Sequence, residues 1–297
     1  MKRKKARYVL FILLQSLVYG IGNPLTKLAY ATITPLWLLA ARFLLAFGLL
    51  LALFGRRIVA QARQAGWRLW LPGSLCCAGA YISCNLALNL TAATNVGFLM
   101  SLPVLFAPAL AAVTLGRRYD LRRLPVQALM VAGLFLLCCN GGAFSFGWGE
   151  ALALLDALCL AGMLVFGEKA LKQMDVLAVT ALQIGVTAAI SLLGAVCFDD
   201  PAVLARADTV AWGTVVYLAL ICSIAAYLLQ NAAVNHLSAG TVSMLQCTQP
   251  ILTAAVSYVL LRETLTGWGL VGAAVIVACL AADSWLDGRG EKTQNRG

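Results

Sequence analysis

The sequence has little charge for its length. Only 11% of its 297 residues are Asp, Glu, Lys or Arg, whereas 62% are hydrophobic and the mean hydropathy is +0.87. A water-soluble domain of this size cannot bury so large an apolar share in one core. The composition therefore predicts a protein that resides in a membrane.

Side chains for catalysis and metal binding are also scarce. The chain has one histidine, His236, and it lacks the His-Glu-x-x-His, Gly-x-Ser-x-Gly and P-loop motifs. The ten cysteines lie inside apolar stretches without the paired Cys-x-x-Cys spacing of a metal site. We therefore expect no enzyme activity, no cofactor and no metal. Since a P-loop is missing, the energy for any transport should come from an ion gradient or from the solute's own gradient.

Long apolar stretches recur along the whole chain. A helix needs about 20 apolar residues to cross the hydrocarbon layer, and ten windows satisfy that length. The connections between them leave no room for a soluble domain. The predicted fold is an all-α membrane protein with ten transmembrane helices at residues 8–28, 35–54, 69–90, 93–115, 124–143, 149–169, 177–198, 211–233, 240–261 and 265–286.

The basic residues indicate how these windows are oriented. Although the formal net charge is +10, eighteen of the 22 Lys and Arg residues lie in alternate loops that share one side with the amino terminus. Such an excess marks the cytoplasmic side of a membrane protein and is not a nucleic-acid surface. We expect a cytoplasmic (inner) membrane protein with both termini cytoplasmic. The first window resembles a signal peptide, but no small-residue cleavage site follows it, so we retain it as a span.

The two halves of the chain resemble each other. A shift of 146 residues places AYISCNLALN (80–89) over AYLLQNAAVN (226–235), and the register from 80 to 104 contains eight identities in 25 positions. Three of them pair polar side chains: Tyr81 with Tyr227, Asn85 with Asn231, and Asn89 with Asn235. Five spans per half is an odd number, so the second copy must enter the membrane from the opposite side. The sequence thus predicts inverted repeats at residues 1–145 and 146–297.

Several short motifs, in their order along the chain, resemble the EamA family of the drug/metabolite transporter (DMT) superfamily. In the first half they are the Tyr19-Gly20 start, Lys27 and the Arg42-Phe43 pair; in the second they are Gln183 near the place of Arg42, Glu263 and a Gly-rich last span. The sequence departs from the family where Gly116 is followed by two arginines instead of Glu. The resemblance implies ten spans and the export or exchange of small metabolites, often amino acids, or of drug-like compounds.

Arg42 and Asp156 are charged residues that lie well inside predicted spans. By helix rise, Arg42 and Asp156 each lie about 10 to 12 Å from the outer surface. Charge is costly there, so such residues usually face a partner or a cavity. Our hypothesis is that Arg42, with Lys27, receives a substrate carboxylate, and that Asp156 receives an amine or a proton. The alternatives are an ion pair between the two residues, or separate charges that reach toward water.

Other polar positions are candidates for a hydrated path. Tyr81 and Asn85 share one helical face by their i, i+4 spacing, and the same holds for their counterparts. They either line such a path or bond neighbouring helices. Asn23 precedes Pro24, which frees backbone carbonyls by removing a donor. The complete set of candidate substrate-binding residues is Asn23, Arg42, Tyr81, Asn85, Asp156, Gln183, Tyr227, Asn231 and Gln246.

These features predict a secondary transporter of small organic metabolites, amino-acid-like or drug-like, that exports them by alternating access. Its partners would be the small-molecule substrate, the lipid bilayer and, as a candidate coupling ion, the proton; no nucleic acid is expected. The alternative is a membrane sensor or assembly protein that keeps the carrier architecture without moving solute. The sequence does not specify the substrate or the oligomeric state.

Overall fold

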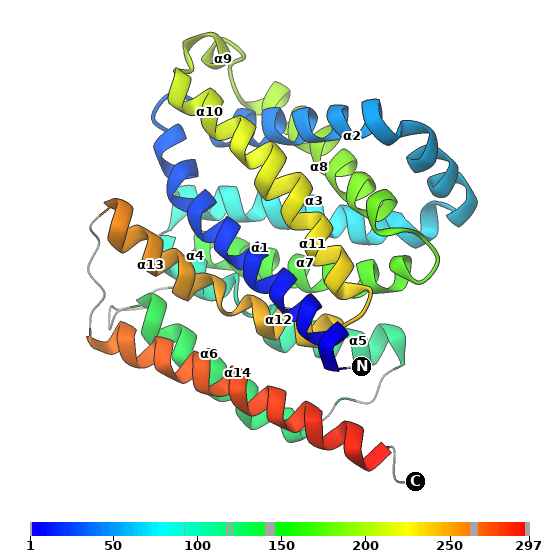
Figure 1. Cartoon of the computed structure of the whole chain (residues 1–297). Helices are drawn as coiled ribbons and strands as arrows, with labels where there is room; N and C mark the ends of the chain where they lie inside the picture. The colour runs from blue at the N-terminus through cyan, green and yellow to red at the C-terminus, as the bar shows by residue number, and fades with distance from the viewer. Residues whose placement is uncertain are drawn as a thin grey trace.

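A computed structural model of the chain describes residues 2–91, 93–116, 119, 121–139, 146–261 and 267–294. Within these ranges it does not describe the side chains of residues 2–4, 23, 24, 27, 88, 89, 93–95, 139, 257, 259–261 and 284–294. The regular elements in the described part are all helical, as the sequence predicts (Figure 1).

The helices of the first half are α1 (Lys2–Ala29), α2 (Pro35–Ala65), α3 (Trp67–Leu90), α4 (Ala93–Leu99), α5 (Pro103–Leu115), the short 3₁₀ helix η1 (Leu121–Arg123) and α6 (Leu124–Cys139). Those of the second half are α7 (Trp148–Leu171), α8 (Val176–Phe198), α9 (Val203–Arg206), α10 (Thr209–Tyr217), the π-helix η2 (Leu218–Ala225), α11 (Ala226–Val234), α12 (Ala239–Gln246), α13 (Gln249–Leu261) and α14 (Gly267–Gln294).

Local sequence explains several helix ends. Asp175, Asp208 and Ser238 are N-caps whose side chains accept hydrogen bonds from backbone N–H groups in the first turns of α8, α10 and α12. Pro35 occupies the first turn of α2, where its missing N–H costs no hydrogen bond. Gly116 ends α5 in a left-handed conformation (φ 63°) that glycine adopts without strain.

Six helical stretches in the described part are long and apolar enough to cross a membrane: Pro35–Ala65, Val96–Leu115, Leu121–Cys138, Trp148–Leu171, Val176–Phe198 and Thr209–Val234. They coincide with six of the ten predicted windows. The other four windows contain α1, α3, α12 with α13, and α14; these are helical but are not among the six. The protein is therefore a multi-pass membrane protein, and the number ten remains a prediction.

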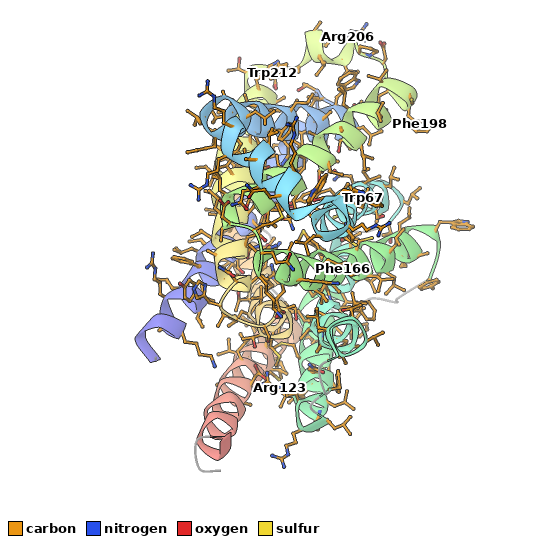
Figure 2. The ribbon with its side chains drawn as sticks, turned by 90° about the vertical axis from the view of Figure 1, so that its right-hand side faces the viewer. Trp67, Arg123, Phe166, Phe198, Arg206 and Trp212 are labelled. Carbon is orange, nitrogen blue, oxygen red and sulfur yellow. The ribbon has the colours of Figure 1, made fainter. Side chains whose placement is uncertain are left out.

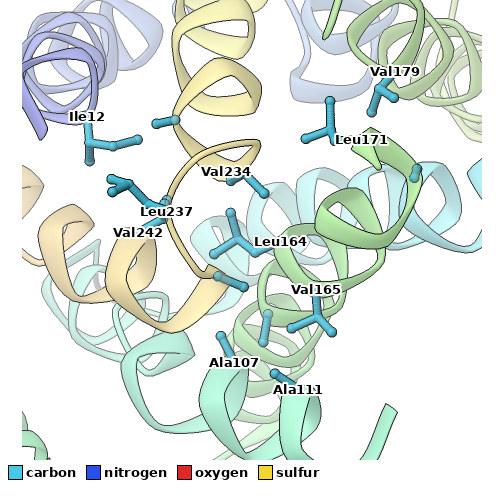
Figure 3. Packing of buried hydrophobic residues seen from close by; sticks show 14 of the residues in the cluster. Ile12, Ala107, Ala111, Leu164, Val165, Leu171, Val179, Val234, Leu237 and Val242 are labelled. Carbon is cyan, nitrogen blue, oxygen red and sulfur yellow. The ribbon is translucent and has the colours of Figure 1, made fainter. Parts of the chain in front are cut away.

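Most of the long helices pack in pairs. α3 lies along α7, α2 along α8, and α6 along α14, while α1 crosses α11 and α13 (Figure 1). One buried apolar cluster joins α1, α5, α7, α8, α11 and α12 (Figure 3). Large apolar side chains such as Trp67, Phe198 and Trp212 instead point away from the bundle (Figure 2). An apolar surface of this kind suits contact with lipid.

The α6–α14 pair is held by a contact between glycines. A Cβ atom on Gly272 would lie 2.5 Å from both the Gly133 carbonyl oxygen and the Leu137 backbone nitrogen. A Cβ atom on Gly133 would likewise meet Val275 at 2.9 Å. The backbones of the two helices approach so closely that only glycine fits, as in many membrane helix pairs.

We predict that Gly272→Ala lowers the free energy of unfolding by about 1–3 kcal/mol, because backbone atoms cannot make room for the added methyl group. The matched control is Gly48→Ala in α2, where a Cβ atom meets nothing within 4 Å. That control should be unchanged or more stable by about 0.5–1 kcal/mol. Melting temperatures of the detergent-purified variants measure both. Equal melting temperatures would show that the α6–α14 contact is not close.

Candidate functional site

Arg42 lies in the interior of the bundle, where only 6% of its surface is exposed. It projects from α2, and its Nε donates a hydrogen bond to Ser223 Oγ of η2 at 3.1 Å. Its guanidinium lies over two aromatic rings, 4.8 Å from the centroid of Phe43 and 5.2 Å from that of Tyr81. Arg42 is thus the centre of a group of side chains, called the central cluster below: Tyr19, Arg42, Phe43, Tyr81, Ser223 and Tyr227.

The Arg42 charge has no ionic partner in the described part of the chain. Two ion pairs are described there in full: Arg57 with Asp175, and Arg123 with Asp283. Arg42 Nη2 is buried and lacks any hydrogen-bond partner among the described residues. A buried charge without a partner costs free energy, and the guanidinium keeps hydrogen-bonding capacity that no described residue uses.

Three tyrosines surround the guanidinium and come from both halves of the sequence. The hydroxyls of Tyr19 (α1) and Tyr81 (α3) are 3.3 Å apart. The rings of Tyr81 and Tyr227 (α11) are nearly parallel, with centroids 6.3 Å apart and an interplanar angle of 28°. The Tyr227 hydroxyl lies 3.1 Å from Cys77 Sγ. The structure therefore brings together Arg42, Tyr81 and Tyr227, three of the predicted residues.

Ser223 belongs to a π-helical segment, η2, in the middle of the eighth predicted span. Such segments are rare and are often found at functional sites, because they shift the faces of a helix by one residue. Here the segment presents Ser223 to Arg42, and the neighbouring Cys222 Sγ lies 3.7 Å from the Val18 carbonyl oxygen of α1. The sequence analysis missed Ser223, since no motif marks a π-helix.

Asp156 occupies a different environment from Arg42. It lies on α7, is 1% exposed, and its Oδ2 atom has no hydrogen-bond partner among the residues described. Its close polar neighbour is the thiol of Cys84 on α3. The alternative that Arg42 and Asp156 form an ion pair is therefore wrong. Each is instead a buried ionisable group with spare hydrogen-bonding capacity.

Asn85 connects α3 to the end of α1. Its Nδ2 donates to the Tyr81 carbonyl at 2.7 Å, and its Oδ1 accepts a hydrogen bond from the Tyr30 hydroxyl. Asn85 is 8% exposed and so faces the protein interior. The side chains of Asn23, Lys27 and Asn89 lie outside the described part of the structure, and their predicted roles stay predictions.

Asn231, the counterpart of Asn85, bonds α11 to α8. Its Nδ2 donates to Thr180 Oγ1 at 2.9 Å and to Gln183 Oε1 at 2.8 Å. Gln183 Nε2 is buried and has no partner among the described residues. Gln183 was expected near the place that Arg42 holds in the other half. In the structure it joins Asn231 and lies beside Gly167 of α7.

Gln246 belongs to a cluster of three amides, the glutamine triad Gln15, Gln230 and Gln246. Gln230 Oε1 accepts hydrogen bonds from Gln15 Nε2 at 2.8 Å and from Gln246 Nε2 at 3.0 Å, and Gln246 Nε2 lies 3.4 Å from Gln15 Oε1. The triad ties α1 to α11 and α12. The sequence analysis missed Gln15 and Gln230, although Gln15 stands four residues before Tyr19 on one helical face.

A cavity of about 230 Å³ lies where α7 ends and α11 turns into α12. Among its lining residues are Glu168, Lys172, Asn235 and His236. Glu168 Oε2 accepts a hydrogen bond from the Ala239 backbone nitrogen at 3.0 Å, which fixes the start of α12 to α7. α11 thus carries Tyr227 of the central cluster and Gln230 of the triad, and Asn235, which lines the cavity, is its C-cap.

The chain was compared with known proteins. The pattern of the EamA-like transporter family matches residues 6–139 and again residues 147–282. A protein described as an uncharacterized transporter, from Archaeoglobus fulgidus, is 28% identical over 280 residues, which cover 91% of this chain and 94% of that protein. A solved crystal structure is similar with a TM-score of 0.82 at 21% identity, covering 96% of this chain and 99% of the other; this likeness concerns the fold alone.

We predict that Arg42→Met raises the melting temperature, because a charge inside a membrane protein costs about 2.5–3.5 kcal/mol. The cation–π contacts offset about 0.5–2 kcal/mol of that cost. The net gain should be about 1 kcal/mol. As a matched control, Arg57→Met breaks an exposed ion pair and should change stability by no more than about 1 kcal/mol. If Arg42→Met melts well below the unmodified protein, the guanidinium is a structural support.

Proposed function

Because the chain belongs to the EamA-like transporter family, we propose that this membrane transporter is a secondary carrier that exports small organic solutes by alternating access. The single observation that supports a solute site is the buried Arg42 guanidinium with a free Nη2 atom. The solutes are amino-acid-like or drug-like compounds with a negative group.

The architecture that we propose is two inverted five-helix repeats, residues 1–145 and 146–297. The family pattern matches the chain twice, once in each half. Under the shift of 146 residues, α1 corresponds to α7, α2 to α8, α3 to α11 and α6 to α14. Exchanging the halves therefore turns the packed pair α3–α7 into the packed pair α11–α1. The pairs α2–α8 and α6–α14 each turn into themselves. Such exchange symmetry is expected of a pseudo-two-fold axis in the membrane plane.

Two contacts join residues that are equivalent under the shift of 146. The rings of Tyr81 and Tyr227 face each other, and Cys247 Sγ lies 3.9 Å from the Ser101 carbonyl oxygen. Equivalent atoms of two symmetric copies can touch only near the axis that relates them. Ser101 and Cys247 also lie at corresponding helix breaks, between α4 and α5 and between α12 and α13. Both observations support a solute site on the axis.

The proposed orientation places both termini in the cytoplasm of a cell whose inner membrane holds the carrier. The N-terminal end of α1 and the C-terminal end of α14 lie on the same side of the molecule (Figure 1). The loops that share this side carry most of the basic residues, which is the distribution found on cytoplasmic faces.

Asp156 is the proposed proton site. A buried carboxylate without a cationic partner is more stable in its neutral form, so its charge can depend on which side of the membrane it faces. A substrate amine is the alternative occupant, and it would require Asp156 to share a space with Arg42. Asp156 neighbours Cys84, whereas Arg42 neighbours Ser223 and the aromatic rings. Because the two groups have different surroundings, a proton is favoured over a substrate amine at Asp156.

The function is tested with protein reconstituted into liposomes. Solutes that raise the melting temperature of the purified protein are first selected, and their exchange across the liposome membrane is then measured. We expect exchange by the unmodified protein and a loss of about tenfold or more with Arg42→Gln, which removes the charge that holds the solute. Binding without exchange would favour the membrane sensor over the carrier.

Asp156→Asn tests the proton role in the same liposomes. The variant should still exchange solute but should not accumulate it under an imposed pH gradient. Asp200→Asn, at an exposed acidic residue, is the control and should accumulate solute normally. An Asp156→Asn variant with an unchanged rate and pH profile would remove the proton from the proposal.

The glutamine triad is the proposed inner closure of the carrier. Its middle member, Gln230, lies on α11 between Tyr227 of the central cluster and Asn235 of the cavity. The residues equivalent to its three members are Ala161, Cys84 and Met100, so the other half has no matching amide cluster. In this proposal the hydrogen bonds of the triad close the inner half of the carrier, and they must break when the carrier opens inward.

We predict that Gln230→Leu loosens this closure. The substitution removes the oxygen that accepts from Gln15 and Gln246. The buried Gln15 amide then loses its acceptor, which costs about 1–3 kcal/mol. Hydrogen–deuterium exchange of the α12 backbone should rise by about tenfold or more. Gln127→Leu in α6, where Gln127 accepts from Tyr119, should leave α12 unchanged. Equal exchange in both variants would contradict the role of the triad.

A further inference from the structure

The charges around Arg42 restrict the chemistry of its ligand. Among the described residues, the groups that face the guanidinium are tyrosine hydroxyls, Cys222, Ser223 and the Phe43 ring. None of them is a carboxylate. The described part of the site therefore offers the single positive charge of Arg42 and no negative charge. We infer that the carried solute is an organic monoanion with an apolar body and no ammonium group, an inference that rests on the proposed function.

A single negative group matches the site in both number and geometry. Arg42 Nε is occupied by Ser223 Oγ, whereas Nη2 is buried and free. A carboxylate is the group that a guanidinium binds best, through short charge-assisted hydrogen bonds. One negative charge neutralises the described cluster, whereas a dianion would leave an excess charge among buried side chains.

Among the side chains that the structure describes, an ammonium group finds no acceptor of opposite charge beside the carboxylate that Arg42 would hold. Asn85 Oδ1 already accepts from Tyr30, and Asp156 contacts Cys84 instead of the central cluster. An amine on the solute would also be repelled by Arg42 itself. Since charge interactions are strong where the dielectric constant is low, a zwitterionic amino acid should bind more weakly than the same molecule without its amine.

The body of the solute meets aromatic rings. Phe43 and Tyr81 contact each other edge to face with centroids 4.9 Å apart, and Tyr81 faces Tyr227 at 6.3 Å. Such walls favour an apolar body over a polyhydroxylated one, because hydroxyl groups would lose water without gaining enough partners. Within the Tyr19–Tyr81 pair one hydroxyl donates to the other, so the O–H of the accepting tyrosine can donate to the second carboxylate oxygen.

The test compares probes with one carbon skeleton and different charge: hydrocinnamate (anion), phenylalanine (zwitterion), phenethylamine (cation) and hydrocinnamamide (neutral). Binding to the purified full-length protein is measured at neutral pH by calorimetry and by thermal shift. Hydrocinnamate should bind about tenfold tighter or more than each of the other three. Butyrate, which lacks the ring, should bind more weakly than hydrocinnamate.

Charge-swapped variants show whether Arg42 causes the preference. Arg42→Gln should abolish the advantage of hydrocinnamate over the neutral amide. Ser223→Asp keeps the guanidinium but places a carboxylate beside it, and it should have the same effect. The double variant Arg42→Gln with Ser223→Asp should prefer phenethylamine. Arg57→Gln, at the exposed pair with Asp175, is the control and should keep the original order. Each variant is first checked for a cooperative melting transition.

The outcomes separate the two levels of the proposal. If phenylalanine binds as tightly as hydrocinnamate, or if neither carboxylate binds, the monoanion inference is wrong, while transport of some other solute in liposomes would leave the proposed function intact. If hydrocinnamate binds with the expected preference but no solute crosses the membrane, the charge inference holds and the carrier is wrong. An unaltered preference in Ser223→Asp would also overturn the inference.

Discussion

The burial of the Arg42 guanidinium determines what the rest of the interior must provide. A charge in the middle of a membrane protein is costly, and the chain lowers that cost only in part, through one hydrogen bond to Ser223 and two aromatic rings. In the proposed function, the remaining cost is offset when an anion binds. The site would then be one where stability is lower than it could be because a ligand is needed there, as is common.

The surrounding helices hold this charge in place by several different contacts. α2 carries Arg42 and packs along α8, α3 carries Tyr81 and packs along α7, and the π-helix η2 supplies Ser223. Buried amides then connect the same helices, through Asn231 with Gln183 and through the glutamine triad. In a membrane, where apolar packing discriminates little between helix faces, such polar contacts specify which faces meet.

The two halves are similar in sequence but differ in their buried polar contacts. Tyr81 and Tyr227 remain equivalent and face each other. Asn85 and Asn231 are also equivalent, yet the first bonds Tyr30 and the second bonds Thr180 and Gln183. The amides of the triad have only apolar or weakly polar counterparts. A duplicated unit with unequal closures can favour one open state over the other, which is a means of giving a carrier a preferred resting side.

Sequence alone determined the class of the protein, the six helical windows that the structure finds long enough to span, the family, and the polar residues worth testing. These are local properties: hydropathy, helix length and residue order can be read along one chain. The tertiary structure decided which polar groups meet. Arg42 and Asp156 have similar expected depths, yet they do not pair, and Gln183 meets Asn231 instead of replacing Arg42. Gln15, Gln230 and Ser223 emerged only when α1, α11 and η2 were placed together. Depth follows from the rise along one helix, whereas contact depends on how each helix is rotated about its axis by its neighbours. In spans that are apolar on nearly every face, the sequence does not specify that rotation.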